Sequence, residues 1–481
     1  MQTVQTNHPK SLRIFFLTEM WERYGFYVVQ TLLALYLALN FKWHDKQVYA
    51  LVGSFTALTY LSPLVGGWIA DHLLGQKRAI LTGAFILLAS YLSLSLIAGD
   101  QGLTLALAGI AVGTGLLKPN VSSLLGNEYP EGSPNRESGF TIFYMGITSG
   151  IILGTTLPSY LNEYFGWSVS FASASIGMLI AMTVFSFGIY CYRIHDYHDY
   201  KYNYKKIMLA TTIILLLWLA SFYILNYPTV ADTVFISVVF FSFAYLLYCV
   251  KSESPLQARQ TIVIALLCII SVMFWAFYFQ MFLSLTLFII RVVKPTLFGI
   301  QFPPPFYVGI QSAGMIALGL LLARSKSHLN RAQQGIRAGN KFLLAMICMM
   351  IAYAIITIAC NFSPPSELLS PFYLIPAYLA ISLAELLLSP IGLSAVTVLA
   401  SRKKVSTMMG IFFVSLGIGG FLSGKLAGLT AIPLGELSVL ELKHTYATGF
   451  NHLFYILLTV TLICIFLNYA IKYFMRSTSD L

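Results

Sequence analysis

Residues 15–39 read FFLTEMWERYGFYVVQTLLALYLAL, a stretch long and apolar enough to cross a membrane. It nevertheless carries Glu19, Glu22 and Arg23. Each charge near the centre of a bilayer costs about 3 kcal/mol on insertion scales. Three such charges are tolerated there only where they face a protein interior or a watery cavity and partly neutralise one another. The stretch therefore predicts a membrane-spanning helix whose charged side is turned away from lipid.

One face of this helix gathers its polar and aromatic side chains. At about 100° per residue, that face holds Glu19, Glu22, Arg23, Phe26, Tyr27 and Gln30. We interpret it as the lining of a transport pathway. The alternative is a buried structural ion cluster, although two acids against one base leave a surplus carboxylate that is able to titrate.

The composition extends this prediction to the whole chain. Of the 481 residues, 58% are hydrophobic and only 10% are charged, whereas about a quarter of the residues of a soluble domain are charged. With about 20 apolar residues per span, we predict an all-α polytopic membrane protein with 14 transmembrane helices. The predicted spans are 12–40, 47–70, 78–98, 102–126, 138–162, 167–192, 207–225, 231–250, 260–290, 305–323, 342–360, 371–399, 406–430 and 449–473.

Lys and Arg residues are distributed unevenly over the loops between these spans. If the N-terminus lies inside, most of them fall on the inner side. The outer segments hold Lys42, Lys46, Arg291, Lys294 and Lys443. The positive-inside rule then predicts a multi-pass protein of the cytoplasmic (inner) membrane with both termini cytoplasmic. Because these loops account for the net charge of +11, nucleic acid is not an expected partner.

The spans divide into six, then two, then six. We predict an N-terminal six-helix bundle over 1–192, a two-helix insertion with cytoplasmic linkers over 193–259, and a C-terminal six-helix bundle over 260–481. Glycine stripes, which let helices approach closely, support a duplication of the two bundles. The stripes are Gly146, Gly150 and Gly154 in the fifth span and Gly420, Gly424 and Gly428 in the corresponding later span. Repeated halves with a site between them at mid-membrane are the architecture of a rocking transporter.

Few other charges fall within the spans. Lys118 lies mid-span beside a proline in GTGLLKPN (113–120) and needs a counter-charge, for which the surplus carboxylate of the first span is the candidate. Glu385 lies in AELLLSP (384–390) of the second half, and Lys425 is expected to reach the interface from the outer end of its span. A base-rich first half and a lone carboxylate in the second half suit a zwitterionic substrate.

The segment GWIADHLLGQKR (67–78) ends the second span at the inner face. Its glycine–aspartate–glycine frame predicts a charged latch whose partners change as the halves rock, with gating roles for Asp71, Lys77 and Arg78. The alternative is an ordinary inner loop, since such loops are rich in Lys and Arg.

Enzymatic and metal chemistry have no support in the sequence. The six cysteines are scattered singly through apolar segments, and no pair has metal-ligand spacing. No zinc-protease motif or nucleophile elbow is present. We therefore expect no metal, no cofactor and no catalytic residues.

Together these motifs resemble the proton-dependent oligopeptide transporter family of the major facilitator superfamily, in its prokaryotic form with two extra helices. The resemblance covers nearly the whole chain. It is carried by Glu19-x-x-Glu22-Arg23 with Tyr27, Tyr60, Gly66-Gly67-x-x-Ala70-Asp71-x-x-Leu74-Gly75, Gly115-x-x-Lys118-Pro119-Asn120, Phe143-Tyr144-x-Gly146-Ile147, Trp275 and Glu385-x-x-x-Ser389-Pro390-x-Gly392.

The resemblance implies a monomeric symporter that imports di- and tripeptides by alternating access, with protons as the coupling ion. Arg23 and Lys118 would hold the peptide carboxylate, and Glu385 its amino group. Glu22, with a contribution from Glu19, would carry the proton. A substrate carboxylate that competes for the two bases favours proton uptake by the carboxylate it displaces.

The remaining expected substrate-binding residues are Tyr27, Tyr60, Thr148, Trp275, Gln311 and Phe412. Several positions depart from the family pattern, namely Thr148 for Asn, Phe279 for Glu, Gln311-Ser312 for Asn-Pro and Phe412-Phe413 for Trp-Phe. These departures favour a second hypothesis, a family member that moves another small zwitterion or a peptide-like compound. A membrane-embedded enzyme and a peptide sensor that does not transport are further alternatives.

Overall fold

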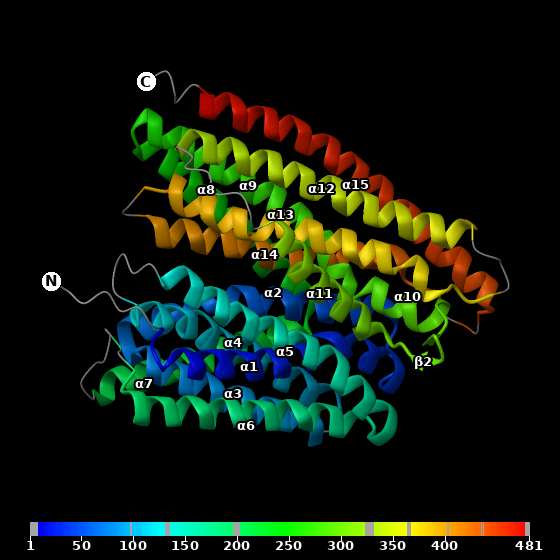
Figure 1. Cartoon of the computed structure of the whole chain (residues 1–481), viewed down its shortest axis with the longest axis horizontal. Coiled ribbons are helices and arrows are strands. Elements are labelled where there is room, and N and C mark those ends of the chain that lie inside the picture. Colours follow the sequence, from blue (N-terminus) through cyan, green and yellow to red (C-terminus); the bar gives the residue numbers. More distant parts are fainter. Residues whose placement is uncertain are drawn as a thin grey trace. The chain divides into compact units, whose positions relative to one another are not determined.

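The computed structural model describes residues 8–96, 99–129, 135–194, 196, 203–322, 331–362, 367–401, 404–433, 435 and 437–476. These residues are almost entirely helical (Figure 1). The first group of helices is α1 (Leu12–Leu35) with the π-helical turn η1 (Tyr36–Asn40), α2 (Asp45–Ile69) with the π-helical turn η2 (Ala70–Leu74), α3 (Gln76–Leu96), α4 (Asp100–Asn127), α5 (Arg136–Phe165) and α6 (Trp167–Tyr192).

The inserted pair and the last group follow in chain order. The pair is α7 (Tyr204–Asn226) and α8 (Pro228–Ser252). The last group is α9 (Pro255–Tyr278), η3 (Phe279–Phe282), α10 (Ser284–Val292), the antiparallel strands β1 (Thr296–Leu297) and β2 (Ile300–Gln301), α11 (Pro304–Leu322), α12 (Arg331–Phe362), η4 (Pro371–Tyr373), α13 (Ile375–Leu399), α14 (Val405–Ala427), η5 (Gly428–Thr430) and α15 (Val439–Arg476).

Thirteen helical segments of the described chain are long and apolar enough to cross a membrane, with α9 to α10 counted as one segment, Pro255–Val292. The helix α1 is not among the thirteen, and it carries the three charges of the first predicted span. Together with α1 these segments correspond to the 14 predicted spans, so the predicted fold class is confirmed. The ninth span is not continuous, because α9 ends at Tyr278 and the chain passes through η3 before α10 begins.

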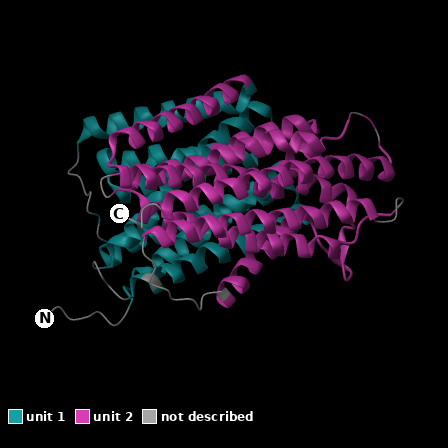
Figure 2. Cartoon of the chain, turned by 90° about the horizontal axis from the view of Figure 1, so that it is seen from above, with its two compact units in different colours: residues 1–33, 58–228 teal, residues 34–57, 229–481 magenta. Residues whose placement is uncertain are grey.

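The chain forms two compact units (Figure 2). Unit 1 comprises Met1–Leu33 and Leu58–Pro228, and unit 2 comprises Ala34–Ala57 and Thr229–Leu481. The unit boundaries therefore fall inside α1, near the middle of α2 and at the start of α8. In unit 1, a side chain at Gly66 would collide with the backbone of Gly115, so α2 and α4 approach at the distance of bare backbones.

The two inserted helices pack on different units. In unit 1, α7 lies against α4, where the indole nitrogen of Trp218 donates to the carbonyl oxygen of Leu105 at 3.0 Å. In unit 2, α8 lies against α14, where the rings of Phe235 and Phe421 are 4.4 Å apart and Asp232 pairs with Lys425 at 2.6 Å. Lys425 is half exposed, and its partner is this aspartate of α8. The division at residues 192 and 259 stays a prediction.

The glycine stripes contact different neighbours in the two units. A Cβ at Gly146 would lie 2.8 Å from the carbonyl oxygen of Phe16 in α1. A Cβ at Gly424 would lie 2.5 Å from the carbonyl oxygen of Tyr49 in α2, and Gly428 has open space around it. It is Gly419, one position away, that faces the first helix of the second half, at 2.5 Å from Cβ of Trp275. The two stripes therefore do not hold equivalent positions, because the glycine of α14 that faces the first helix of its half is Gly419 and not a member of the predicted stripe.

Candidate functional site

The charged face of α1 is buried inside unit 1. Glu19, Glu22 and Arg23 are only 2%, 0% and 4% exposed. The guanidinium of Arg23 donates to both carboxylate oxygens of Glu22, from Nη2 to Oε1 at 2.5 Å and from Nε to Oε2, and its Nε also lies 3.4 Å from Oε1 of Glu19. One cation thus serves two carboxylates. Among the described residues, Oε2 of Glu19 has no hydrogen-bond partner.

Lys118 adds a second base from α4. Its ammonium lies 4.9 Å from the centre of the Tyr60 ring, a cation–π distance. It is also near enough to interact electrostatically with both Glu19 and Glu22. The structure therefore brings together the four residues expected to couple protons, with Tyr60 beside them.

The glycine residues of α5 pack closely against this face of α1. A Cβ at Gly150 would lie 2.8 Å from Cβ of Arg23, and one at Gly154 would lie 3.0 Å from Cβ of Tyr27. The backbone of α5 therefore fixes how far these two side chains can move toward it. Thr148 of the same helix uses its hydroxyl to bond the carbonyl oxygen of Tyr144 at 3.1 Å.

Glu385 of α13 lies in unit 2 and is held by neutral groups. Its Oε2 accepts a hydrogen bond from the Tyr278 hydroxyl of α9 at 2.8 Å and another from the Gln311 amide of α11 at 2.7 Å. No Lys or Arg within the described part of the chain forms an ion pair with it. Gln311, which departs from the family pattern, is thus a direct partner of the carboxylate.

Aromatic side chains surround the α9 side of Glu385. The ring of Trp275 stacks on Phe279 at 5.3 Å and meets Tyr278 edge-on at 4.8 Å. Its buried Nε1 has no hydrogen-bond partner in the described chain. Phe412 of α14 is 2% exposed, and its ring lies 2.5 Å from where a Cβ on Gly392 would be. Phe412 thus fills the contact between α14 and α13.

The segment predicted to be a latch turns sharply between η2 and α3. Gly75 has a positive φ of 81°, a conformation that suits glycine. The backbone N–H of Lys77 donates to Asp196 at 3.0 Å, and the amide of Gln76 donates to Ser123 at 2.7 Å. Asp71 is exposed in η2, and the structure tests no gating role for Asp71, Lys77 or Arg78.

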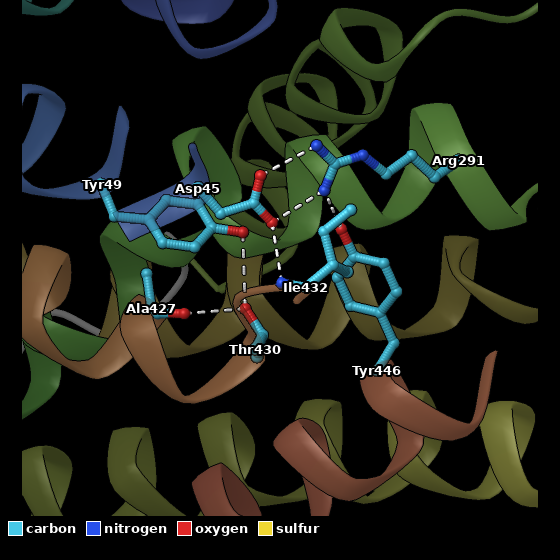
Figure 3. Close-up of polar contacts among 7 residues, drawn as sticks. All are labelled: Asp45, Tyr49, Arg291, Ala427, Thr430, Ile432 and Tyr446. Atoms are coloured by element: carbon cyan, nitrogen blue, oxygen red, sulfur yellow. Dashed lines mark hydrogen bonds and ion pairs between the residues drawn. The ribbon is translucent and has the colours of Figure 1, made fainter. Parts of the chain in front are cut away.

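A second, partly buried ion pair lies in unit 2 and was not predicted from the sequence (Figure 3). Asp45 at the start of α2 accepts two hydrogen bonds of 2.8 Å from the guanidinium of Arg291, and a third from the backbone N–H of Ile432 at 3.1 Å. Arg291 also donates to the hydroxyl of Tyr446 at 2.8 Å. Two opposite charges at the ends of different spans were the only available signal, and no sequence spacing links them.

Within the described residues, no group of three or more His, Cys, Asp or Glu side chains is placed to hold a metal ion. The chain is thus a multi-pass helical membrane protein with buried carboxylates beside bases in one unit and beside neutral donors in the other. That combination is typical of a transporter as a class. The family model PTR2, described as the POT family, matches residues 77–440, and the chain belongs to this family of transporters, not to a family of enzymes.

Curated relatives are similar over most of their length. Over 455 residues the chain is 30% identical to the dipeptide and tripeptide permease A of Edwardsiella piscicida, covering 93% of this chain and 90% of that protein. It is 29% identical over 432 residues to the dipeptide and tripeptide permease A of Escherichia coli (strain K12), covering 88% and 85%.

Solved structures share the fold over the whole length. A structure from work on substrate recognition in proton dependent oligopeptide transporters has a TM-score of 0.84 and 26% identity, and covers 96% of this chain and 99% of that one. The crystal structure of tetrameric PepTSo2 has a TM-score of 0.84 and 28% identity, with 97% and 99% coverage. The resemblance inferred from the motifs is confirmed.

Proposed function

We propose that this chain is a proton-coupled symporter that imports di- and tripeptides across the cytoplasmic membrane by alternating access, with both termini cytoplasmic. The observation that carries the proposal is the contrast between the base-supported cluster of unit 1 and the cation-free carboxylate of unit 2. The names of the curated relatives, dipeptide and tripeptide permeases, support peptides as the substrate.

Arg23 and Lys118 are the groups that would bind the peptide carboxylate. Arg23 already divides its guanidinium between Glu22 and Glu19. A substrate carboxylate that takes a share of this positive charge weakens the hold on the two glutamates. Glu22, with a contribution from Glu19, then takes up a proton, because a carboxylate that loses its counter-charge in a buried site is stable only when neutral.

Glu385 would bind the peptide amino group. Its two neutral donors hold the carboxylate in place without cancelling its charge, so an ammonium group meets no competing cation there. The residues proposed to contact the rest of the peptide are Tyr27, Tyr60, Thr148, Trp275, Gln311 and Phe412. No cofactor is needed, because each charge moved through 100 mV supplies about 2.3 kcal/mol.

Asp71, Lys77 and Arg78 are proposed as the inner latch of the transport cycle. The functional unit is proposed to be a monomer, since both halves of the site come from one chain. PepTSo2 forms a tetramer in its crystals, and the oligomeric state of this chain can be measured by light scattering in detergent.

A second candidate function is transport of another small zwitterion. It is favoured by Thr148, whose hydroxyl is already bonded to the backbone of its own helix. A threonine so engaged offers the substrate no N–H donor and one hydroxyl acceptor, whereas an amide in its place would offer both. A substrate with no internal peptide bond would lose less from this exchange than a peptide.

Uptake of labelled dialanine into liposomes that hold the purified protein tests the proposal. We expect saturable uptake that depends on an inward proton gradient. Uptake that is saturable but independent of the gradient would contradict proton coupling. The absence of dialanine uptake by folded protein that takes up another zwitterion would favour the second candidate.

A further inference from the structure

Two buried tyrosines of unit 2 contact each other between α11 and α13. Tyr307 and Tyr378 are each 0% exposed, and their ring centres are 5.3 Å apart with the planes inclined by 44°. The hydroxyl of each is buried and has no hydrogen-bond partner among the residues that the structure describes. Burying an unsatisfied hydroxyl is unfavourable. Phenylalanine would fill the same space without that cost, so the two hydroxyls require an explanation.

The two tyrosines are in line with Glu385. On α13, Tyr378, Ser382 and Glu385 are spaced by four and three residues and share one face. On α11, Tyr307 precedes Gln311 by one turn, and Gln311 donates to Glu385 at 2.7 Å. We name Tyr307, Tyr378, Gln311, Ser382 and Glu385 the polar column.

The helices are held close along this column. The single hydroxyl proton of Ser382 is shared between the carbonyl oxygen of Gln311 at 2.7 Å and that of Tyr378 at 2.9 Å. Gly314 of α11 permits this approach, because a Cβ there would lie 2.7 Å from the same hydroxyl. The polar column is thus a row of polar side chains between two apolar helices, and it ends at the carboxylate of Glu385.

Water is the ligand that fits the unpartnered hydroxyls. Each phenol can both donate and accept a hydrogen bond, and buried waters typically make about three bonds to polar groups that are otherwise unsatisfied. A chain of such waters and phenols also conducts protons, since each hydroxyl accepts a proton on its oxygen as it passes its own proton onward.

We infer that the polar column is hydrated and delivers a proton to Glu385. In this step a proton enters from water at the Tyr307–Tyr378 end, and each phenol returns to its neutral form after the transfer. The proton binds Oε1 of Glu385, since Oε2 accepts the two hydrogen bonds from Tyr278 and Gln311. The carboxylate becomes a neutral carboxylic acid, and nothing is oxidised or reduced.

The groups around Glu385 suit such a step. The titratable neighbours that the described contacts give to Glu385 and the two tyrosines are phenols: Tyr278 from α9, Tyr307 from α11, Tyr378 from its own helix and Tyr353 from α12. Tyr353 donates to the carbonyl oxygen of Phe277 at 2.9 Å and so lies outside the column. Neither α9, α11, α12 nor α14 contributes a described charged side chain that pairs with Glu385.

The consequence rests on the proposed function, in which Glu385 holds the amino group of the substrate. Protonation of Glu385 removes the negative charge that binds the ammonium and so promotes substrate release. Glu385 would then be a second proton site, reached separately from the Glu19–Glu22 pair. The two sites would act at opposite ends of the same substrate.

The test uses Tyr307→Phe, Tyr378→Phe and the double variant, which keep both rings and remove only the hydroxyls. We expect the double variant to lose about tenfold or more in proton-driven dialanine uptake, because positioned proton-transfer groups contribute about 10²–10⁴ in rate. Counterflow exchange, which needs no net proton movement, should stay within about twofold of wild type. The control is Tyr455→Phe, whose ring is exposed on α15. Unchanged proton-driven uptake, or equal losses in uptake and exchange, would overturn the inference.

A second readout separates this inference from the proposed function. The infrared carboxyl band of protonated Glu385 is identified in purified protein by its absence from Glu385→Gln. Its rate of exchange in D₂O should fall about tenfold or more in the double variant, on the same rate argument. If the double variant exchanges the Glu385 carboxyl proton as fast as the wild type, the proposed proton delivery by the polar column is wrong even if dialanine is transported. Slowed exchange in a protein that does not transport dialanine would support the column and reject the peptide substrate.

Discussion

The carboxylates of α1 and the carboxylate of α13 lie inside different units and are held by different kinds of group. Glu22 and Glu19 share the guanidinium of Arg23, with Lys118 nearby. Glu385 receives two hydrogen bonds from neutral donors. A carboxylate that depends on a cation is released when another anion competes for that cation. A carboxylate held by neutral donors keeps its charge available for a cation, so the two sites suit opposite ends of a zwitterion.

The Asp45–Arg291 ion pair of unit 2 shows what a fully paired arrangement looks like. In the Asp45–Arg291 pair, both carboxylate oxygens are bonded, and the guanidinium reaches one further acceptor on Tyr446 (Figure 3). In the α1 cluster, by contrast, one oxygen of Glu19 has no hydrogen bond in the described chain. The surplus of acid over base distinguishes a site that can titrate from one that is fully paired.

The largest change in transport is expected from removing a carboxylate that is held by Arg23. Glu22→Gln should abolish gradient-driven accumulation of dialanine, because an amide cannot carry the proton. Counterflow exchange of substrate should remain partly intact, since Arg23 is still present to bind the peptide carboxylate. Both activities are measured in liposomes of matched protein content. Uphill accumulation by Glu22→Gln would show that another group carries the coupled proton.

The next largest change is expected from removing the carboxylate that is held by neutral donors. Glu385→Gln should weaken binding of peptides with a free amino group by about 10- to 100-fold, since hydrogen bonds to charged groups are worth about 1.5–3 kcal/mol. Binding of the N-acetylated peptide should change much less. Competition by dialanine and by N-acetyl-dialanine against a labelled substrate measures both. Equal losses for the two competitors would remove Glu385 from amino-group recognition.

A smaller effect concerns how α5 positions Arg23. Gly150→Ala places a Cβ 2.8 Å from Cβ of Arg23 and against the backbone of Met20, and such overpacking costs about 1–3 kcal/mol. We expect a lower melting temperature and slower uptake. The matched control is Gly67→Ala on α2, where a Cβ meets nothing within 4 Å. If the two variants behave alike, the glycine stripe does not position Arg23.

The smallest effect is expected at an exposed charge pair between α8 and α14. Lys425 and Asp232 are about half exposed, at 51% and 43% of their side chains. Exposed pairs contribute about 0–1 kcal/mol, so Lys425→Gln should change the melting temperature slightly and leave dialanine uptake unchanged. A loss of uptake comparable with that of Glu385→Gln would instead place Lys425 in the transport site.

The sequence predicts what is local to one helix better than what is shared between helices. The face of α1 that holds Glu19, Glu22 and Arg23 follows from helical periodicity, and hydropathy places most of the spans. The contact of Gln311 with Glu385, and the pairing of Asp45 with Arg291, join residues far apart in the chain. No spacing rule connects such residues, so these contacts required the structure.

Two features of the structure differ from the sequence predictions for a similar reason. The break between α9 and α10 lies in a continuously apolar stretch. Hydropathy does not change where the backbone leaves the α-helical conformation, so it does not reveal this break. The glycine stripe of α14 was predicted from its four-residue spacing, and this spacing does not indicate which neighbouring helix the glycines face. Gly420 and Gly424 face α2, and the neighbouring Gly419 faces α9.

Proton uptake on substrate binding tests directly whether the peptide carboxylate displaces a glutamate from Arg23. Dialanine is titrated calorimetrically into the purified protein in two buffers with different ionisation enthalpies, which gives the number of protons taken up per peptide bound. We expect net proton uptake by the wild type, because the peptide carboxylate displaces a glutamate from Arg23, and little or none by Glu22→Gln. Dialanine binding by the wild type without proton uptake would contradict the account.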